Sequence, residues 1–84
     1  MSTPEMQEMV RQVHRSRQLY VARSRDGMAP MRVLFHPEHE IDLAAHLQDS
    51  PGDGRLTPAA GPTLFGMLIK FDMSVMPGTF RFEP

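Results

Sequence analysis

Three histidines close together in the sequence are the first candidates for chemistry: His36, His39 and His46. On a helix, His39, Asp42 and His46 would share one face, and imidazole with carboxylate can hold zinc or another transition metal. The spacing differs from that of a helical zinc site, whose two histidines stand four residues apart. We therefore expect no metal and no cofactor, with His36 ending a strand and the other two in solvent.

Hydroxyl nucleophiles are available but stand in no catalytic pattern. Ser50 or Ser74 could be combined with His36 and Asp72, yet none of them lies in a nucleophile elbow or a similar local signature. The chain has no cysteine to serve instead. The glycines of the segment 49–63 do not follow a strand and open a helix, as a phosphate-binding loop requires. We expect no catalytic residues and no enzyme activity.

Charge is divided into two blocks, although the net charge is only −1. One block is basic and contains no acid: Arg11, Arg15, Arg17, Arg23 and Arg25. The other is acidic and contains no lysine or arginine: Glu38, Glu40, Asp42, Asp49 and Asp53. The two blocks can meet within one chain, or each can meet its opposite on a neighbouring subunit. The sequence leaves both arrangements open.

The basic block also offers a nucleic-acid surface through Arg11, Arg15 and Arg25. The sequence pI of about 6.4 and the absence of lysine from the block argue against this interpretation. No helix-turn-helix pattern follows the block either. Nucleic acid is therefore the alternative partner, and protein is the expected one.

The elements that must position these residues begin with a long helix over 4–26. Ser2 or Thr3 can cap it, Pro4 suits its first turn, and Gly27 is a plausible stop. Its apolar stripe is narrow, and a narrow stripe on a long helix favours packing against another helix or a partner. The stripe and its flanking arginines form the predicted protein interface: Met6, Met9, Val10, Arg11, Val13, Arg15 and Arg17.

The rest of the chain predicts a strand over 31–36 and a short amphipathic helix over 38–48. A proline- and glycine-rich loop over 49–63 follows. Strands over 64–71 and 79–82 then form a C-terminal hairpin, in which Gly66 marks a bulge or a close backbone approach.

These elements predict one small α+β domain over 1–84, with a helical arm over 1–27 and an α+β body over 28–84. A chain of 84 residues has room for one domain only. Five large apolar side chains of the predicted hairpin should hold the core: Phe65, Ile69, Phe71, Phe80 and Phe82. The eight methionines suit either core packing or an adaptable contact surface.

No apolar run approaches the ~20 residues of a membrane-spanning helix, and the first residues lack the pattern of a signal peptide. We therefore expect no membrane partner, and a location in the cytoplasm or in a particle assembled there. Domains this small often gain stability from a partner subunit, so a homo-oligomer is expected.

The stretch 64–82 carries a resemblance to a known family. Leu64-Phe65-Gly66, an apolar strand, Met76-Pro77-Gly78-Thr79 and a final strand resemble the closing segment of tailed-bacteriophage major capsid proteins. The segment 31–37, a strand running into His-Pro and a short helix, is similar to a strand–helix unit of those proteins. The chain lacks their axial domain and extended loop, so it is not a major capsid protein itself.

The resemblance implies structural assembly rather than catalysis. We expect a non-enzymatic protein-binding or assembly protein, an accessory structural component of a phage-type particle or a homo-oligomer. The alternative is a small phage-type regulator that inhibits a host protein or binds nucleic acid.

Overall fold

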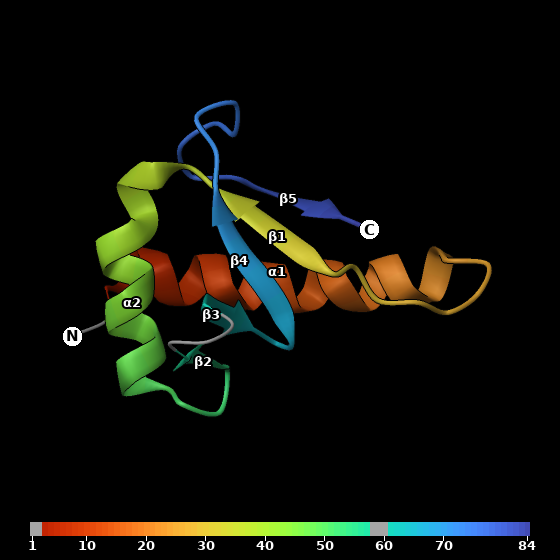
Figure 1. Cartoon of the computed structure of the whole chain (residues 1–84), viewed down its shortest axis with the longest axis horizontal. Helices are drawn as coiled ribbons and strands as arrows, with labels where there is room; N and C mark the ends of the chain where they lie inside the picture. The colour runs from red at the N-terminus through yellow and green to blue at the C-terminus, as the bar shows by residue number, and fades with distance from the viewer. Residues whose placement is uncertain (1–2, 58–60) are drawn as a thin grey trace.

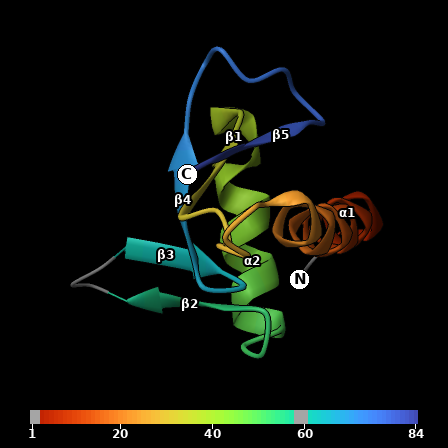
Figure 2. The same cartoon turned by 90° about the vertical axis from the view of Figure 1, so that its right-hand side faces the viewer.

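The computed structural model describes residues 3–57 and 61–84, which form an α+β fold with a five-stranded mixed sheet. The elements in chain order are α1 (Pro4–Arg23), β1 (Arg32–Phe35), the 3-10 helix η1 (Pro37–His39), α2 (Glu40–Asp49), β2 (Gly54–Thr57), β3 (Gly61–Leu64), β4 (Met67–Phe71) and β5 (Phe80–Glu83). Figure 1 shows α1 crossing behind the sheet, and Figure 2 shows it nearly end-on at one side. The predicted fold class is confirmed.

Helix α1 begins as predicted and ends earlier. The Thr3 hydroxyl accepts a hydrogen bond from the Met6 backbone N–H at 3.1 Å, while Ser2 lies outside the described residues. The helix ends at Arg23 rather than Asp26 because the next residues form a local turn. In that turn Asp26 accepts hydrogen bonds from the Ser24 hydroxyl and the Met28 N–H, an alternative to helical bonding. No described helix is both long and apolar enough to cross a membrane.

The strand order is β2-β3-β4-β1-β5, with β1 parallel to β4 and every other pair antiparallel. The predicted pairing of 64–71 with 79–82 is therefore wrong, because β1 lies between β4 and β5. The physical reason is burial, since Val33, Leu34 and Phe35 of β1 are all at most 3% exposed. A strand this apolar is best covered in the middle of a sheet, and strands consecutive in sequence do not always pair.

The segment predicted as one strand over 64–71 is two strands joined by a tight turn. Phe65 and Gly66 both have positive φ, 51° and 83°, and join Leu64 to its partner Met67. Positive φ at both central residues is the requirement of a type I′ hairpin turn. Gly66 therefore serves a turn, and the predicted bulge is not present there.

The segment predicted as a loop over 49–63 contains β2 and β3, which pair with each other antiparallel. Glycine and proline each have a low propensity for strands. The segment nevertheless forms strands because β3 pairs with β4. The tip of this hairpin, 58–60, lies outside the described residues.

The core lies between α1, α2 and one face of the sheet. Its buried side chains come from all three parts: Met6, Val10, Val13, Val33, Phe35, Leu43, Leu47, Leu64, Met67 and Ile69. Of the predicted core, Ile69 is among them, while the four predicted phenylalanines pack at the margin and are partly buried. Phe35 of the interior strand β1, at 0% exposure, is the fully buried aromatic side chain of the described core.

Candidate functional site

The predicted interface on α1 is largely occupied by the protein itself. Met6, Val10 and Val13 are 2%, 3% and 0% exposed, and Met9 packs against the same cluster. The apolar inner face of the sheet covers this half of the stripe, so these side chains are not open to a partner in this fold. The segment predicted as an arm is therefore packed against the body over its first half.

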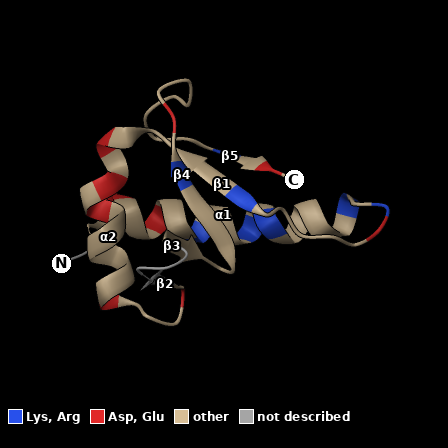
Figure 3. Ribbon diagram, in the orientation of Figure 1, with Lys and Arg blue, Asp and Glu red and all other residues tan. Residues whose placement is uncertain are grey.

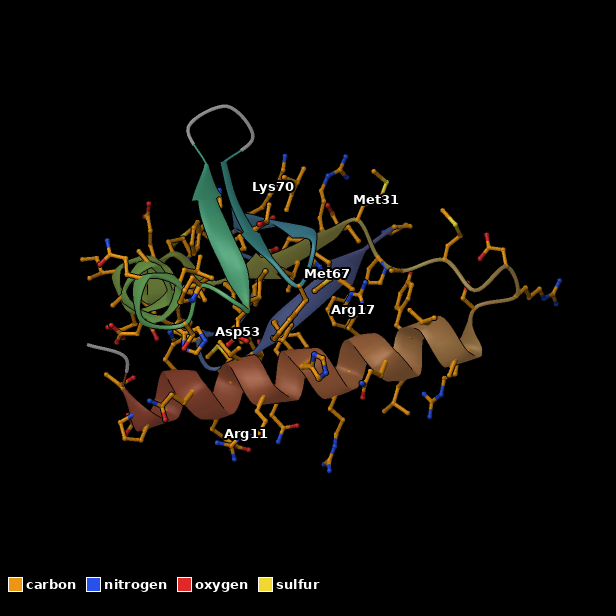
Figure 4. All side chains as sticks on the ribbon, turned by 90° about the horizontal axis from the view of Figure 1, so that it is seen from below. Arg11, Arg17, Met31, Asp53, Met67 and Lys70 are labelled. Atoms are coloured by element: carbon orange, nitrogen blue, oxygen red, sulfur yellow. The ribbon has the colours of Figure 1, made fainter. Side chains whose placement is uncertain are left out.

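The arginines of the basic block point in different directions. Arg11 and Arg15 are exposed, and Arg11 pairs with Glu8 at 3.1 Å. Figure 4 shows Arg11 pointing away from the sheet and Arg17 lying between α1 and the sheet. The Arg17 Nε is buried without a hydrogen-bond partner among the described residues. Arg25 is exposed in the turn after α1.

The basic and acidic blocks do not meet within the described part of the chain. The ion pairs there join nearby residues or neighbouring strands, and none links the arginines of 11–25 to the acids of 38–53. Figure 3 shows several acidic residues along α2 and several basic residues along the second half of α1.

His36, His39 and His46 lie apart from one another, and each makes a different hydrogen bond. The His36 Nδ1 accepts a hydrogen bond from the Glu38 N–H at 3.1 Å, which caps η1. The His39 Nε2 accepts one from the Gly78 N–H at 2.8 Å, which joins η1 to the connection before β5. Within 3–57 and 61–84, no group of three or more His, Asp or Glu side chains is placed to hold a metal ion.

His46 is the third histidine and the one buried polar side chain of the described core, at 4% exposure. Its Nε2 lies 2.8 Å from Asp53 Oδ2, an arrangement that can orient an imidazole as an acid or base. The adjoining hollow, of about 380 Å³, is lined by Gln7, Val10, Arg11, His14, His46, Asp53 and Phe65. This lining supplies no hydroxyl or thiol nucleophile, so the geometry fits a hydrogen bond that ties α2 to the start of β2.

A groove of about 500 Å³ lies between the second half of α1 and β5. Its lining is Ser16, Leu19, Tyr20, Arg23, Ser24, Phe80 and Phe82. The ring of Tyr20 meets that of Phe82 edge-on at 5.8 Å, and Phe80 lies 5.5 Å from Phe82. Leu19 remains 49% exposed at the rim. We name these seven residues the α1–β5 groove.

The second half of α1 has little of its own chain to cover it. The buried side chains of α1 end at Val13, and Figure 1 shows the C-terminal part of the helix extending beyond the strands. Two apolar side chains of this half, Leu19 and Tyr20, line the groove. This half of α1 contains no buried residue, although Tyr20 packs against Phe82.

Strand β5 forms one edge of the sheet, because it pairs only with β1. The Phe35 carbonyl accepts a hydrogen bond from Asp72, next to the end of β4, so Phe35 directs its backbone groups toward β4. Successive residues of a strand direct their backbone N–H and C=O groups to opposite sides, so those of Leu34 point toward β5. Leu34 pairs with Arg81, whose backbone groups therefore point toward β1. Phe80 and Phe82 consequently turn their N–H and C=O groups to the open edge.

Sequence reasoning missed this site, although its parts are visible in the sequence. Tyr20 belongs to the predicted stripe of α1, and Phe80 and Phe82 alternate as one face of a strand. Their meeting depends on β5 lying beside β1 at the sheet edge, and no local pattern specifies that strand order.

Comparison with known proteins finds no matching family model, no matching curated protein and no matching solved structure.

Proposed function

We propose that this protein is a non-enzymatic protein-binding module that accepts an extended strand from another chain along the edge of β5. The observation that carries the proposal is the juxtaposition of an open strand edge and an apolar groove. Strand addition uses both, because main-chain hydrogen bonds supply affinity and pockets for alternate side chains supply specificity.

The backbone of such a strand would pair with the outward N–H and C=O groups of Phe80 and Phe82. Successive side chains of a strand point to opposite faces. Every second side chain of the added strand would therefore face the same side as Phe80 and Phe82. Leu19 and Tyr20 line the groove on that side and would bury an apolar side chain of the added strand.

The charge near the groove favours an acidic partner. Arg23 lines the groove, and Arg25 follows in the exposed turn beyond it. The described residues give neither arginine an ion pair with an acid of the same chain. Complementary charge chiefly sets specificity and association rate, so we expect the partner to carry acidic residues close to the side chains that enter the groove.

A selection from a library of extended peptides on the immobilised protein tests the proposal. The selected peptides should bind the native chain and lose at least tenfold in affinity for Leu19→Asp, which places a carboxylate in the groove. Ile41→Asp is the matched control, because Ile41 is 82% exposed on α2 and lies outside the groove lining. Peptides that bind equally to both variants would contradict the proposal.

The setting of this activity remains a prediction from the sequence: an accessory role in a phage-type particle, or a homo-oligomer in the cytoplasm. Binding of a host protein at the same edge is the regulator version of the proposal. Native mass, with identification of copurifying proteins, separates the two.

One observation favours the nucleic-acid alternative. Arg11 and Arg15 are both exposed and stand four residues apart, on one side of α1. A double change, Arg11→Glu with Arg15→Glu, should abolish nucleic-acid binding if that face is used. The same change should leave peptide binding at the α1–β5 groove intact, which separates the two functions.

A further inference from the structure

Strand β5 is complementary to itself in one antiparallel register. Its sequence is Phe80-Arg81-Phe82-Glu83. When two copies pair about Phe82, that residue faces Phe82 of the second copy, and Arg81 faces Glu83 of the second copy. Opposite charges placed directly across two strands are stabilising, and the two-fold axis supplies this pair twice.

The backbone directions select the same register. Because Phe82 turns its N–H and C=O to the open edge, pairing about Phe82 lets the two copies exchange both hydrogen bonds on the axis. Arg81 and Glu83 then form the non-hydrogen-bonded pairs, in which the side chains lie closest. Pairing about Arg81 would set two arginines opposite each other and would turn the backbone groups away from the partner.

The ion pairs that the two charged residues of β5 make within one chain would continue across this contact. Glu83 lies 3.5 Å from Arg32, and Arg81 lies 3.9 Å from Asp72. The four side chains are between 38% and 53% exposed, so each can take a second partner. In the paired sheet they would form a row of alternating sign, Arg32, Glu83, then Arg81 and Asp72 of the second copy.

The apolar side chains of β5 would also pack between the two copies. Phe80 and Phe82 line the α1–β5 groove, and their counterparts would lie beside them on the same face of the joined sheet. The two grooves would then become one, with Leu19 and Tyr20 of both copies along its walls.

From these four features we infer that a second copy of this chain occupies the β5 edge and that the protein is a two-fold dimer with a continuous ten-stranded sheet, twice the five strands of one chain. The inference rests on the proposed function, since it names the partner strand. Strand addition at β5 can hold for a different partner even where self-pairing fails.

Charge exchange tests the register. In Arg81→Glu two carboxylates face each other across the axis, and in Glu83→Arg two guanidinium groups do. Each variant alone should dimerise at least tenfold more weakly than the native chain in sedimentation equilibrium. An equimolar mixture should restore the dimer as a heterodimer, because every facing pair is then complementary. Circular dichroism of each variant alone checks that the chain is still folded.

A native chain that sediments as a monomer at millimolar concentration would overturn the inference. Variants that dimerise as tightly as the native chain, or a mixture that stays monomeric, would overturn it as well. If peptides still bind in a manner that depends on Leu19, strand addition survives and only the second copy is rejected as the partner. If that binding is absent too, the proposed function fails with it.

Discussion

At the scale of single residues, Gly54 has the most constrained surroundings of the six glycines. A Cβ added there would collide with the Thr63 backbone carbonyl and come within 2.8 Å of Leu47 Cδ2. Leu47 is itself 4% exposed and has little room to move. The absence of a side chain at Gly54 therefore lets β2 approach β3 and α2.

We expect Gly54→Ala to lower the free energy of unfolding by about 1–3 kcal/mol, as overpacking of a close contact does. Gly52→Ala is the matched control, because an added Cβ there meets nothing within 4 Å. Denaturant unfolding of the two variants measures the difference. Equal stability would mean that β2 does not approach β3 in this way.

Two aspartates hold turns and should titrate below their ordinary pKa of 3.8. The Ser24 hydroxyl and then the Met28 N–H lower the pKa of Asp26, and the Ser74 N–H does so first for Asp72. A lowered folded-state pKa contributes stability that is present above pH 3.8 and is lost as the pH falls through the folded-state value.

Carbon-detected NMR titration of the two carboxyl groups checks this, with both midpoints expected below 3.8. Ser24→Ala removes the largest cause at Asp26, so it should raise that midpoint and leave the Asp72 midpoint unchanged. A midpoint of either native aspartate at or above 3.8 would show that its turn is not formed in solution.

Some residue roles could be predicted from the sequence because they depend on near neighbours. Thr3 as a helix cap is of this kind. His36, predicted to end a strand, follows the last residue of β1 and caps η1. The role of His46 could not be predicted in the same way. Asp53, its partner, comes after the end of α2, whereas helical spacing pointed instead to Asp42.

At the scale of elements, the two helices and β1 were predicted from capping, periodicity and the content of strand-forming residues. The strands β2 and β3 were missed because their pairing, β2 with β3 and β3 with β4, rather than their own composition, makes them strands. The order of β4, β1 and β5 was also missed, since it depends on which strand has the most apolar surface to bury. The α1–β5 groove follows from that order, so the site was missed together with it.

The interior position of β1, between β4 and β5, makes Phe35 the decisive core residue. Phe35→Ala should cost about 3–5 kcal/mol of unfolding free energy, because this side chain is fully buried. Phe71→Ala should cost less, since Phe71 packs at the core margin. Phe35→Leu is the milder variant if the alanine form fails to fold.

Thermal and denaturant unfolding give the comparison between these variants. A larger loss for Phe71→Ala, or for Phe71→Leu against Phe35→Leu, would contradict the strand order and favour the hairpin that the sequence alone predicts.

At the scale of the whole molecule, the sequence predicts a protein interface on α1 between Met6 and Arg17, whereas we propose one at the α1–β5 groove and the edge of β5. The first half of α1 is used by the chain itself, while the second half and β5 remain open. Four exposed methionines add to the apolar surface: Met28, Met31, Met73 and Met76. Met73 and Met76 lie in the connection that leads into β5.

Strand addition at the edge of β5 is the central claim of this account. Its most direct measurement is amide hydrogen exchange at Phe82, followed by NMR in a dilute sample, in a concentrated sample and with a selected peptide. Because the Phe82 N–H points to the open edge, it should exchange quickly when dilute and become protected at high concentration or with peptide. The amide of Gln48 in α2, which lies away from the edge of β5, serves as the unchanged control. The Gly78 amide is unsuitable because it already donates a hydrogen bond to His39.

Protection of Phe82 in the concentrated sample alone would support the second copy, and protection with peptide would support strand addition in general. A Phe82 amide that exchanges at the same rapid rate in all three samples would contradict the account. So would an amide that is already protected in the dilute monomer, because the edge would then be closed by the chain itself.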